Sequence, residues 1–294
     1  MNRQKGFWSL LATAVILGTF GVWIRELDKY FSEFGQVVSR SLAATVIILL
    51  IIIIKKVKLK VPKDKVKYLA GFTIAFPLSV ICFTYSATSI KVTNALFMLY
   101  VGIMISTYLW GRFAFGEQIT SKKIISICLL LTGLVVFVYP FSASTFSIGT
   151  VLGIMAGLLE GTAHAFRKYM KDVQREAVVL FQSLSGAFVA LILLLISGQV
   201  FATEWTARGI IVSVIFGILL VTIGYLLVIG FSNYDVNVGT IILASELFFA
   251  LVINFIFLRE EPTLTEAIGG AIIFIGAIFN NIHIGKSHDK ITSV

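Results

Sequence analysis

The sequence has little charge for its length. Only 13% of its 294 residues are Asp, Glu, Lys or Arg, whereas an ordinary soluble domain has about 25%. Hydrophobic residues make up 58%, and the mean hydropathy is +0.97. Too few polar side chains remain to cover a water-soluble globule of this size. The composition therefore excludes a disordered chain, a coiled coil and most soluble enzymes, and it predicts an integral membrane protein.

Cysteine and histidine are also scarce. Cys82 and Cys128 each lie inside an apolar run, which argues against a disulfide framework or a metal pair. The ATP-binding pattern GxxxxGK[ST] and the metalloprotease pattern HExxH are both absent. We therefore expect no cofactor, no metal and no ATP-driven step. The net charge is +9, but the bases show no nucleic-acid-binding motif, so we expect no nucleic-acid partner.

Long apolar runs are what the sequence does contain. A membrane-spanning helix needs about 20 mostly apolar residues. Ten such runs follow one another with only short intervals between them. They cover residues 7–24, 35–54, 67–84, 92–111, 122–140, 148–168, 177–197, 208–230, 237–258 and 265–284. The sequence thus predicts an all-α protein with ten transmembrane helices in the lipid bilayer.

The positions of Lys and Arg predict the orientation of these helices. Most of the 24 basic residues fall at the N-terminus, in the even-numbered gaps between spans and at the C-terminus. The densest cluster is the 55–67 segment, KKVKLKVPKDKVK. Because basic loops stay on the cytoplasmic side, we expect a multi-pass protein of the cell membrane with both termini in the cytoplasm. The 55–67 segment then anchors the topology against anionic lipid heads.

The sequence also contains weak internal repeats. Residues 18–23 (GTFGVW) resemble 161–166 (GTAHAF), 115–120 resemble 259–264, and 131–134 resemble 274–277, at an offset of 143 or 144. These matches predict two five-helix repeats, residues 1–141 and 147–290. Five spans are an odd number, so the second repeat is inverted relative to the first. Such inverted repeats are typical of secondary transporters, whose substrate sites lie between the repeats.

Several short segments resemble one family. Residues 40–44 (RSLAA), Gly116-Glu117, Glu246 and the run from Glu261 through Gly269 to Gly276 are similar to the EamA-type branch of the drug/metabolite transporter superfamily. The resemblance covers the whole chain as two tandem units. It implies ten helices around a central cavity and the transport, often the export, of small metabolites. Many members have Pro after the Glu of span 9, whereas Leu247 follows it here.

Four ionisable residues lie deep in the predicted spans, where charge is costly. Glu160 and His164 are one turn apart and share one helix face. They could bind an ionic substrate or a proton, or form a structural ion pair. Glu246 lies ten residues into span 9 with no base within one turn. It is a candidate proton carrier or substrate contact, the alternative being a structural carboxyl. Arg40 is close to a membrane face, where a structural pairing with Glu26, Asp28 or Glu33 is favoured.

Aromatic and small residues complete the candidate site. Trp23, Asn94 and Tyr100 lie on spans expected to face the centre and could line a substrate pathway. Gly149, Gly153, Gly157 and Gly161 form a ladder on span 6. Such a stripe lets two helices approach closely, either within one chain or across a homodimer.

Three functions are compatible with these features. The leading hypothesis is a secondary transporter of small metabolites such as amino acids, working by alternating access, with a proton as a candidate coupling ion. The second is an intramembrane enzyme with Glu160 and His164 as acid and base, which is disfavoured because the pair lacks a third positioned group. The third is a membrane scaffold that assembles through the glycine ladder.

Overall fold

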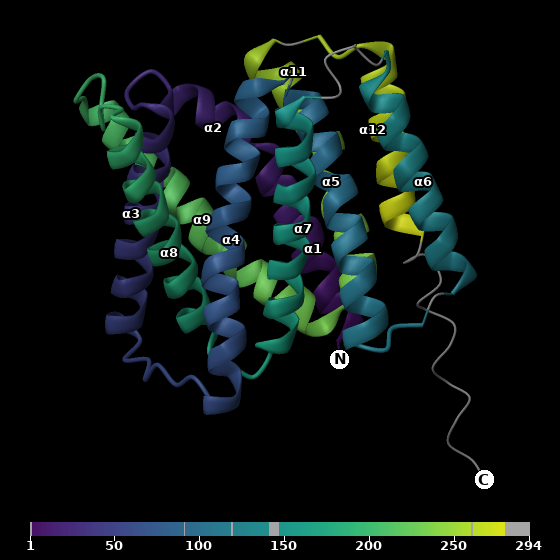
Figure 1. Cartoon of the computed structure of the whole chain (residues 1–294), viewed down its shortest axis with the longest axis horizontal. Coiled ribbons are helices and arrows are strands. Elements are labelled where there is room, and N and C mark those ends of the chain that lie inside the picture. Colours follow the sequence, from purple (N-terminus) through teal and green to yellow (C-terminus); the bar gives the residue numbers. More distant parts are fainter. Residues whose placement is uncertain (1, 91, 119, 141–146, 260, 280–294) are drawn as a thin grey trace.

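The computed structural model describes residues 2–90, 92–118, 120–140, 147–259 and 261–279, except the side chains of 87–88, 92–94 and 258. These residues form a bundle of roughly parallel helices (Figure 1). In chain order the helices are α1 (Arg3–Gly18), α2 (Phe20–Leu27), α3 (Glu33–Ile54), η1 (Lys63–Lys65), α4 (Val66–Ser89), α5 (Val92–Leu109), η2 (Trp110–Ala114), α6 (Ser121–Val138), α7 (Ile148–Tyr169), α8 (Arg175–Ser197), α9 (Ala207–Asn233), α10 (Val236–Ala244), α11 (Glu246–Leu258) and α12 (Leu264–Phe279).

The helices confirm the predicted spans. Nine stretches of the described residues are long and apolar enough to cross a membrane, and α12 is a shorter apolar helix at the position of the tenth. Residues 280–284, the predicted end of that span, lie outside the described part. The protein is therefore an all-α, multi-pass membrane protein.

Two spans are interrupted, which the apolar runs did not predict. The first is divided at Thr19 into α1 and α2, and the ninth is divided at Ser245 into α10 and α11. Each residue donates a hydrogen bond from its hydroxyl to the carbonyl three residues earlier, Thr19 to Ile16 and Ser245 to Ile242, both at 2.6 Å. Such back-bonding often bends helices, and the ninth span is interrupted here although it contains no proline.

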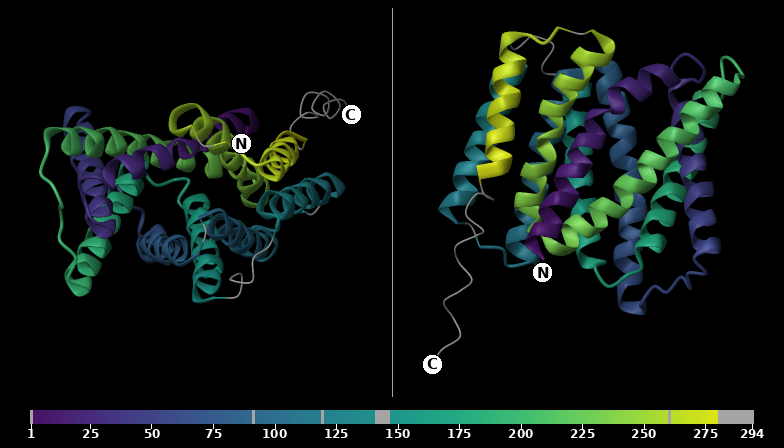
Figure 2. Two further views of the ribbon diagram at one scale, coloured as in Figure 1. Left: turned by 90° about the horizontal axis from the view of Figure 1, so that it is seen from above. Right: turned by 180° about the vertical axis from the view of Figure 1, so that it is seen from behind.

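The helices form a central group with a pair at either side. Helix α7 packs against α4 and α5 in the middle of the bundle, while α3 with α8 and α6 with α12 form the outer pairs (Figure 1). The view from above shows the same separation of the outer pairs (Figure 2). Polar side chains that occupy the middle are therefore enclosed by helices from both halves of the sequence.

The glycine ladder packs inside the molecule. A Cβ atom on Gly157 would lie 2.0 Å from the Leu99 carbonyl oxygen and 2.7 Å from Gly102 Cα, and one on Gly161 would lie 2.8 Å from Ser106 Cβ. The backbones of α7 and α5 thus touch directly. Since this stripe is covered by α5, a homodimer would have to use another surface.

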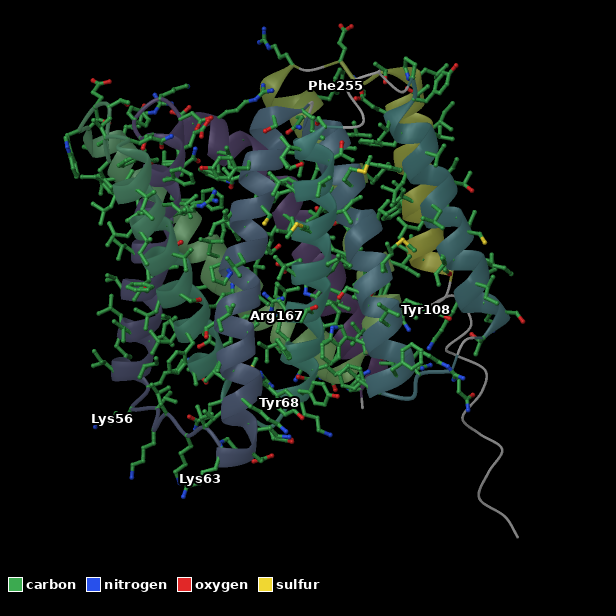
Figure 3. The ribbon with its side chains drawn as sticks, viewed as in Figure 1. Lys56, Lys63, Tyr68, Tyr108, Arg167 and Phe255 are labelled. Carbon is green, nitrogen blue, oxygen red and sulfur yellow. The ribbon has the colours of Figure 1, made fainter. Side chains whose placement is uncertain are left out.

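One end of the bundle gathers the basic segments. Lys56 and Lys63 lie at the same end as the N-terminus (Figure 3). The backbone N–H of Lys60 donates to Gln174 Oε1 at 3.1 Å, so the 55–65 segment meets the loop between α7 and α8. We call this the N-terminal end. The basic segments at the N-terminus and at 55–65 thus lie at one end, as the alternation of the spans predicts. Which side of the membrane this end faces stays a prediction.

Candidate functional site: a polar centre between two interrupted spans

Glu246 lies at the interruption of the ninth span. It is the first residue of α11, directly after Ser245. Its partly buried side chain interacts with Tyr100 on α5 and experiences the charge of Glu160 on α7. The buried Tyr100 hydroxyl also donates to the Leu243 carbonyl oxygen at 3.3 Å, one of the backbone groups beside the interruption. Two predicted site residues from different helices, Glu246 and Tyr100, therefore interact in the bundle interior, and Glu160 on a third helix lies close enough for its charge to act on Glu246.

The two interrupted spans pack against each other. A Cβ atom on Gly18, at the end of α1, would lie 2.9 Å from the backbone nitrogen of Ala250 on α11. One turn further, Gly21 on α2 faces Asn254, whose Oδ1 atom is buried and accepts no hydrogen bond. Backbone without regular helical bonding is tolerated at membrane depth only where protein or a water-filled space surrounds it. The paired interruptions are therefore packed against each other inside the protein.

Glu160 and His164 are joined by a third group, Arg167. Its guanidinium Nη1 lies 3.3 Å from Glu160 Oε1 and 2.7 Å from His164 Nδ1, and Nη2 donates to Gln182 Oε1 on α8 at 3.2 Å. Arg167 is 0% exposed and lies within the bundle (Figure 3). The sequence interpretation that the Glu160–His164 pair lacks a third positioned group is therefore wrong.

Aromatic rings enclose this cluster. The Arg167 guanidinium lies over the ring of Phe72, 4.8 Å from its centroid, and His164 stacks on Phe231 at 4.4 Å. A desolvated guanidinium gains from such cation–π contacts. The ion pair of Glu160 with Arg167 neutralises the carboxylate, which leaves Glu246 as the carboxyl of the centre that has no basic partner among the described residues.

Arg40 lies apart from this centre. Its guanidinium is 4.7 Å from the ring centroid of Phe216 on α9, it experiences the charge of Asp28, and its Nη1 atom is buried without a hydrogen-bond partner. Asp28 accepts a hydrogen bond from Gln36, and burial raises the pKa of this carboxyl. Of the three carboxyls predicted as partners, Asp28 is the one beside Arg40.

The remaining candidate residues, Trp23 and Asn94, are not placed in the polar centre by the structure. Trp23 packs in an apolar cluster with Leu27 and Phe216, at the same end as Arg40. The side chain of Asn94 lies outside the described part. An apolar cleft lined by Phe34, Pro77 and Gly186 lies between α3, α4 and α8 and does not border the polar centre. The described residues contain no group of three His, Cys, Asp or Glu side chains that could hold a metal.

Sequence reasoning missed a second polar cluster at the N-terminal end. Glu117, which follows η2, binds Lys168 on α7 at 2.6 Å. Asp235, which precedes α10, binds Lys123 on α6 at 2.9 Å. Glu117 entered the sequence analysis only through the family resemblance. Its position in a loop did not indicate that it is buried and paired, because a charge beside a membrane span is normally solvated.

The comparisons with known proteins cover the whole chain. The EamA-like transporter family matches twice, at residues 4–139 and 147–282. An uncharacterized transporter of Clostridium kluyveri is 26% identical over 97% of this chain and 96% of its own length. One of Archaeoglobus fulgidus is 25% identical over 71% of this chain and 74% of its own.

A solved structure has the same fold. A crystal structure described only as that of a protein superposes with a TM-score of 0.80, covering 96% of this chain and 99% of that one at 16% identity. Identity this low shows the fold alone, whereas the two family matches together span nearly all of the sequence. The chain is therefore a membrane protein that belongs to the EamA-like transporter family.

Proposed function

We propose that this member of the family is a secondary transporter that exports small metabolites by alternating access. Amino acids and related compounds are the first candidates for its substrate. The observation that carries the proposal is Glu246, a carboxyl at the junction of two half-helices in the bundle interior, beside Tyr100 and Glu160. A charge at this depth is retained when it is wetted, paired or needed for function.

The arrangement supports two roles for Glu246. The carboxylate could attract the ammonium group of a substrate, or it could carry a proton whose release favours one access state. Either role requires that the group interact differently with the two states. The interruption at Ser245 supports such a difference between the two access states, because a change in the angle between α10 and α11 at that point would move Glu246.

Replacing Glu246 with Gln tests the proposal. The amide keeps the size and hydrogen bonding of the side chain but cannot ionise. We expect Glu246→Gln protein to insert and fold like the parent, while counterflow of labelled amino acids in proteoliposomes falls at least about tenfold, or loses its pH dependence. Glu204→Gln, which changes an exposed carboxyl in the loop before α9, is the matched control. Unchanged counterflow and pH profile in folded Glu246→Gln protein would remove Glu246 from the mechanism.

The orientation in the membrane has its own test. We propose that the N-terminal end faces the cytoplasm, because it gathers the lysines of the 55–67 segment. In a protein without Cys82 and Cys128, a cysteine in place of Lys60 should react with a membrane-impermeant thiol reagent only after the cells are opened. A cysteine in place of Thr203, at the opposite end, should react in intact cells. The reverse pattern would show that the orientation is inverted.

The intramembrane enzyme is the second candidate, and the contacts of its supposed acid and base argue against it. Arg167 binds both Glu160 and His164, and the buried imidazole is stacked on Phe231. Neither side chain is therefore placed to exchange a proton with a reacting group. Counterflow separates the two functions, since a carrier exchanges labelled solute without consuming it.

A further inference from the structure

We propose that Glu117 and Lys168 form a latch that closes the N-terminal end of the transport pathway, and that Glu117 positions the half-helix leading to Glu246. This inference rests on the proposed transport function. The latch joins two halves of the chain, since Glu117 follows the fourth span and Lys168 ends the sixth.

The described hydrogen bonds of the Glu117 carboxylate all come from the other half of the chain. Oε1 accepts from Lys168 Nζ at 2.6 Å and from the backbone N–H of Val236 at 2.8 Å. Oε2 accepts from Asn237 Nδ2 at 2.9 Å. The first backbone N–H groups of a helix have no partner within that helix. Glu117 thus supplies, from 119 residues away, the cap that α10 needs at its N-terminus.

The structure makes room for this carboxylate. The Glu117 side chain is 4% exposed. A Cβ atom on Gly111, in η2, would lie 2.8 Å from Glu117 Oε2 and 2.4 Å from Asn237 Nδ2. A side chain at position 111 would therefore force Asn237 or the Glu117 carboxylate to shift. Because residue 111 is glycine, the segment from η2 to Glu117 fits closely against the start of α10.

A second set of ion pairs surrounds the first. Asp235, beside the start of α10, lies 2.9 Å from Lys123 Nζ and 3.6 Å from Arg3. The Lys168 ammonium lies over the ring of Phe115, 4.7 Å from its centroid. Arg3, Glu117 and Lys123 come from the first half of the chain, whereas Lys168 and Asp235 come from the second. Separating the first-half residues at this end from α7 and from the start of α10 would break these contacts together.

Among the described ion pairs, the one that joins the two halves of the chain at the opposite end is exposed. Glu26 on α2 binds Arg208 on α9 at 2.7 Å, but the Arg208 side chain is 71% exposed. Exposed pairs contribute little, because water and salt screen them. Buried ion pairs are different, since removing one partner strands the other in a low-dielectric site. When both partners separate and water enters, each charge is solvated again, so the contact can close and open as a two-state element.

The position of the latch links it to the polar centre. Val236, which binds Glu117, is the first residue of α10, and α10 ends at the interruption before Glu246. A movement that releases the start of α10 would therefore reorient the helix that leads to Glu246. The latch acts by positioning this helix, and it has no contact with the carboxyl of Glu246 among the described interactions.

Side-specific labelling tests the latch independently of transport. Thr240 is 1% exposed and lies one turn beyond Val236 on α10. A cysteine at this position, in protein lacking Cys82 and Cys128, reports water access behind the latch. The probe is a membrane-impermeant sulfonated methanethiosulfonate applied to membrane vesicles of either orientation. A cysteine in place of Lys60 identifies which vesicles expose the N-terminal end.

We expect slow labelling of the Thr240→Cys protein from both sides. Glu117→Gln should raise the labelling rate by about tenfold or more, and only from the side that labels the Lys60→Cys protein, because the loss of one buried charge shifts the closed–open equilibrium by at least that factor. Lys168→Met removes the ammonium but keeps the cap on α10, and it should have the same effect. Glu26→Gln is the matched control at the opposite end, and it should leave this rate unchanged.

Three outcomes would overturn the proposal: an unchanged rate in both variants, an increase from the opposite side, or an equal increase from both sides. If Glu117→Gln does not fold, Lys168→Met decides the question by itself. Failure of the latch and failure of the transport proposal remain distinguishable. If the parent protein shows counterflow but the two variants leave the labelling rate unaltered, only the latch is rejected. If the variants raise labelling from one side but the parent shows no counterflow, the transport function is rejected.

Discussion

Gly157→Leu is expected to prevent the protein from folding to a stable, monodisperse form. The first atom of the new side chain would lie 2.0 Å from the Leu99 carbonyl oxygen and 2.7 Å from Gly102 Cα. Both are backbone atoms, which cannot move aside as a flexible side chain can. We expect a loss of about 3 kcal/mol or more, at the upper end of the range for overpacked interiors. Yield after size-exclusion chromatography in detergent and the thermal unfolding midpoint would measure it.

A pair of alanine substitutions provides the control for this prediction. Gly157→Ala adds a single carbon at the same contact and should already lower the unfolding midpoint. Gly186→Ala adds the same carbon on α8, where its nearest neighbour would be Ser41 Oγ at 3.4 Å. That change should be neutral, or stabilising by up to about 1 kcal/mol through helix propensity. Normal folding of both Gly157 variants would show that α5 and α7 do not pack backbone to backbone.

Arg167→Met is expected to lower stability by about 3–5 kcal/mol, the range for breaking one side of a buried ion pair. Methionine keeps much of the length of the side chain but removes the charge. Glu160 and Gln182 would then lose the partner that binds them at 3.3 Å and 3.2 Å. The guanidinium contacts with Phe72 and Phe76 would be lost as well. Thermal unfolding in detergent provides the measurement.

Two further variants separate the charge effect from packing. Arg208→Met removes an arginine from an exposed pair and should cost about 0–1 kcal/mol. Glu160→Gln combined with Arg167→Met should be more stable than Arg167→Met alone, because the stranded carboxylate is gone. Equal losses for the Arg167 and Arg208 variants would contradict the buried cluster.

The sequence predicts only some of the contacts between the residues of the candidate site. The depth of Glu246, Glu160 and Arg40 follows from their positions within apolar runs, and the Glu160–His164 neighbourhood follows from a spacing of one turn. The part that Arg167 plays in this cluster was not predicted, because in the sequence it adjoins Lys168 and a basic loop. Its burial depends on Phe72 of α4, Gln182 of α8 and the direction in which α7 faces them, and none of these is visible in the local sequence.

The interruptions of the first and ninth spans were likewise not predictable from the local sequence. The apolar runs at 7–24 and 237–258 contain no proline, so their hydrophobicity predicts continuous helices. Thr19 and Ser245 each bend the helix through a bond to the preceding turn. Serine and threonine make that bond in many helices without interrupting them. Here α1 packs against α11, and the glycines at that contact allow the bent segments to fit together.

The sequence by itself determined the membrane environment, the ten spans, the alternation of their ends and the glycine stripe, because hydrophobicity, helical period and the positions of basic residues are local properties of the chain. Only the tertiary structure decided which polar groups meet. Glu117 binds the start of α10, 119 residues away, and Tyr100 meets Glu246 from another helix. Such pairings depend on how the helices rotate and pack, and a single sequence does not encode them in any local pattern.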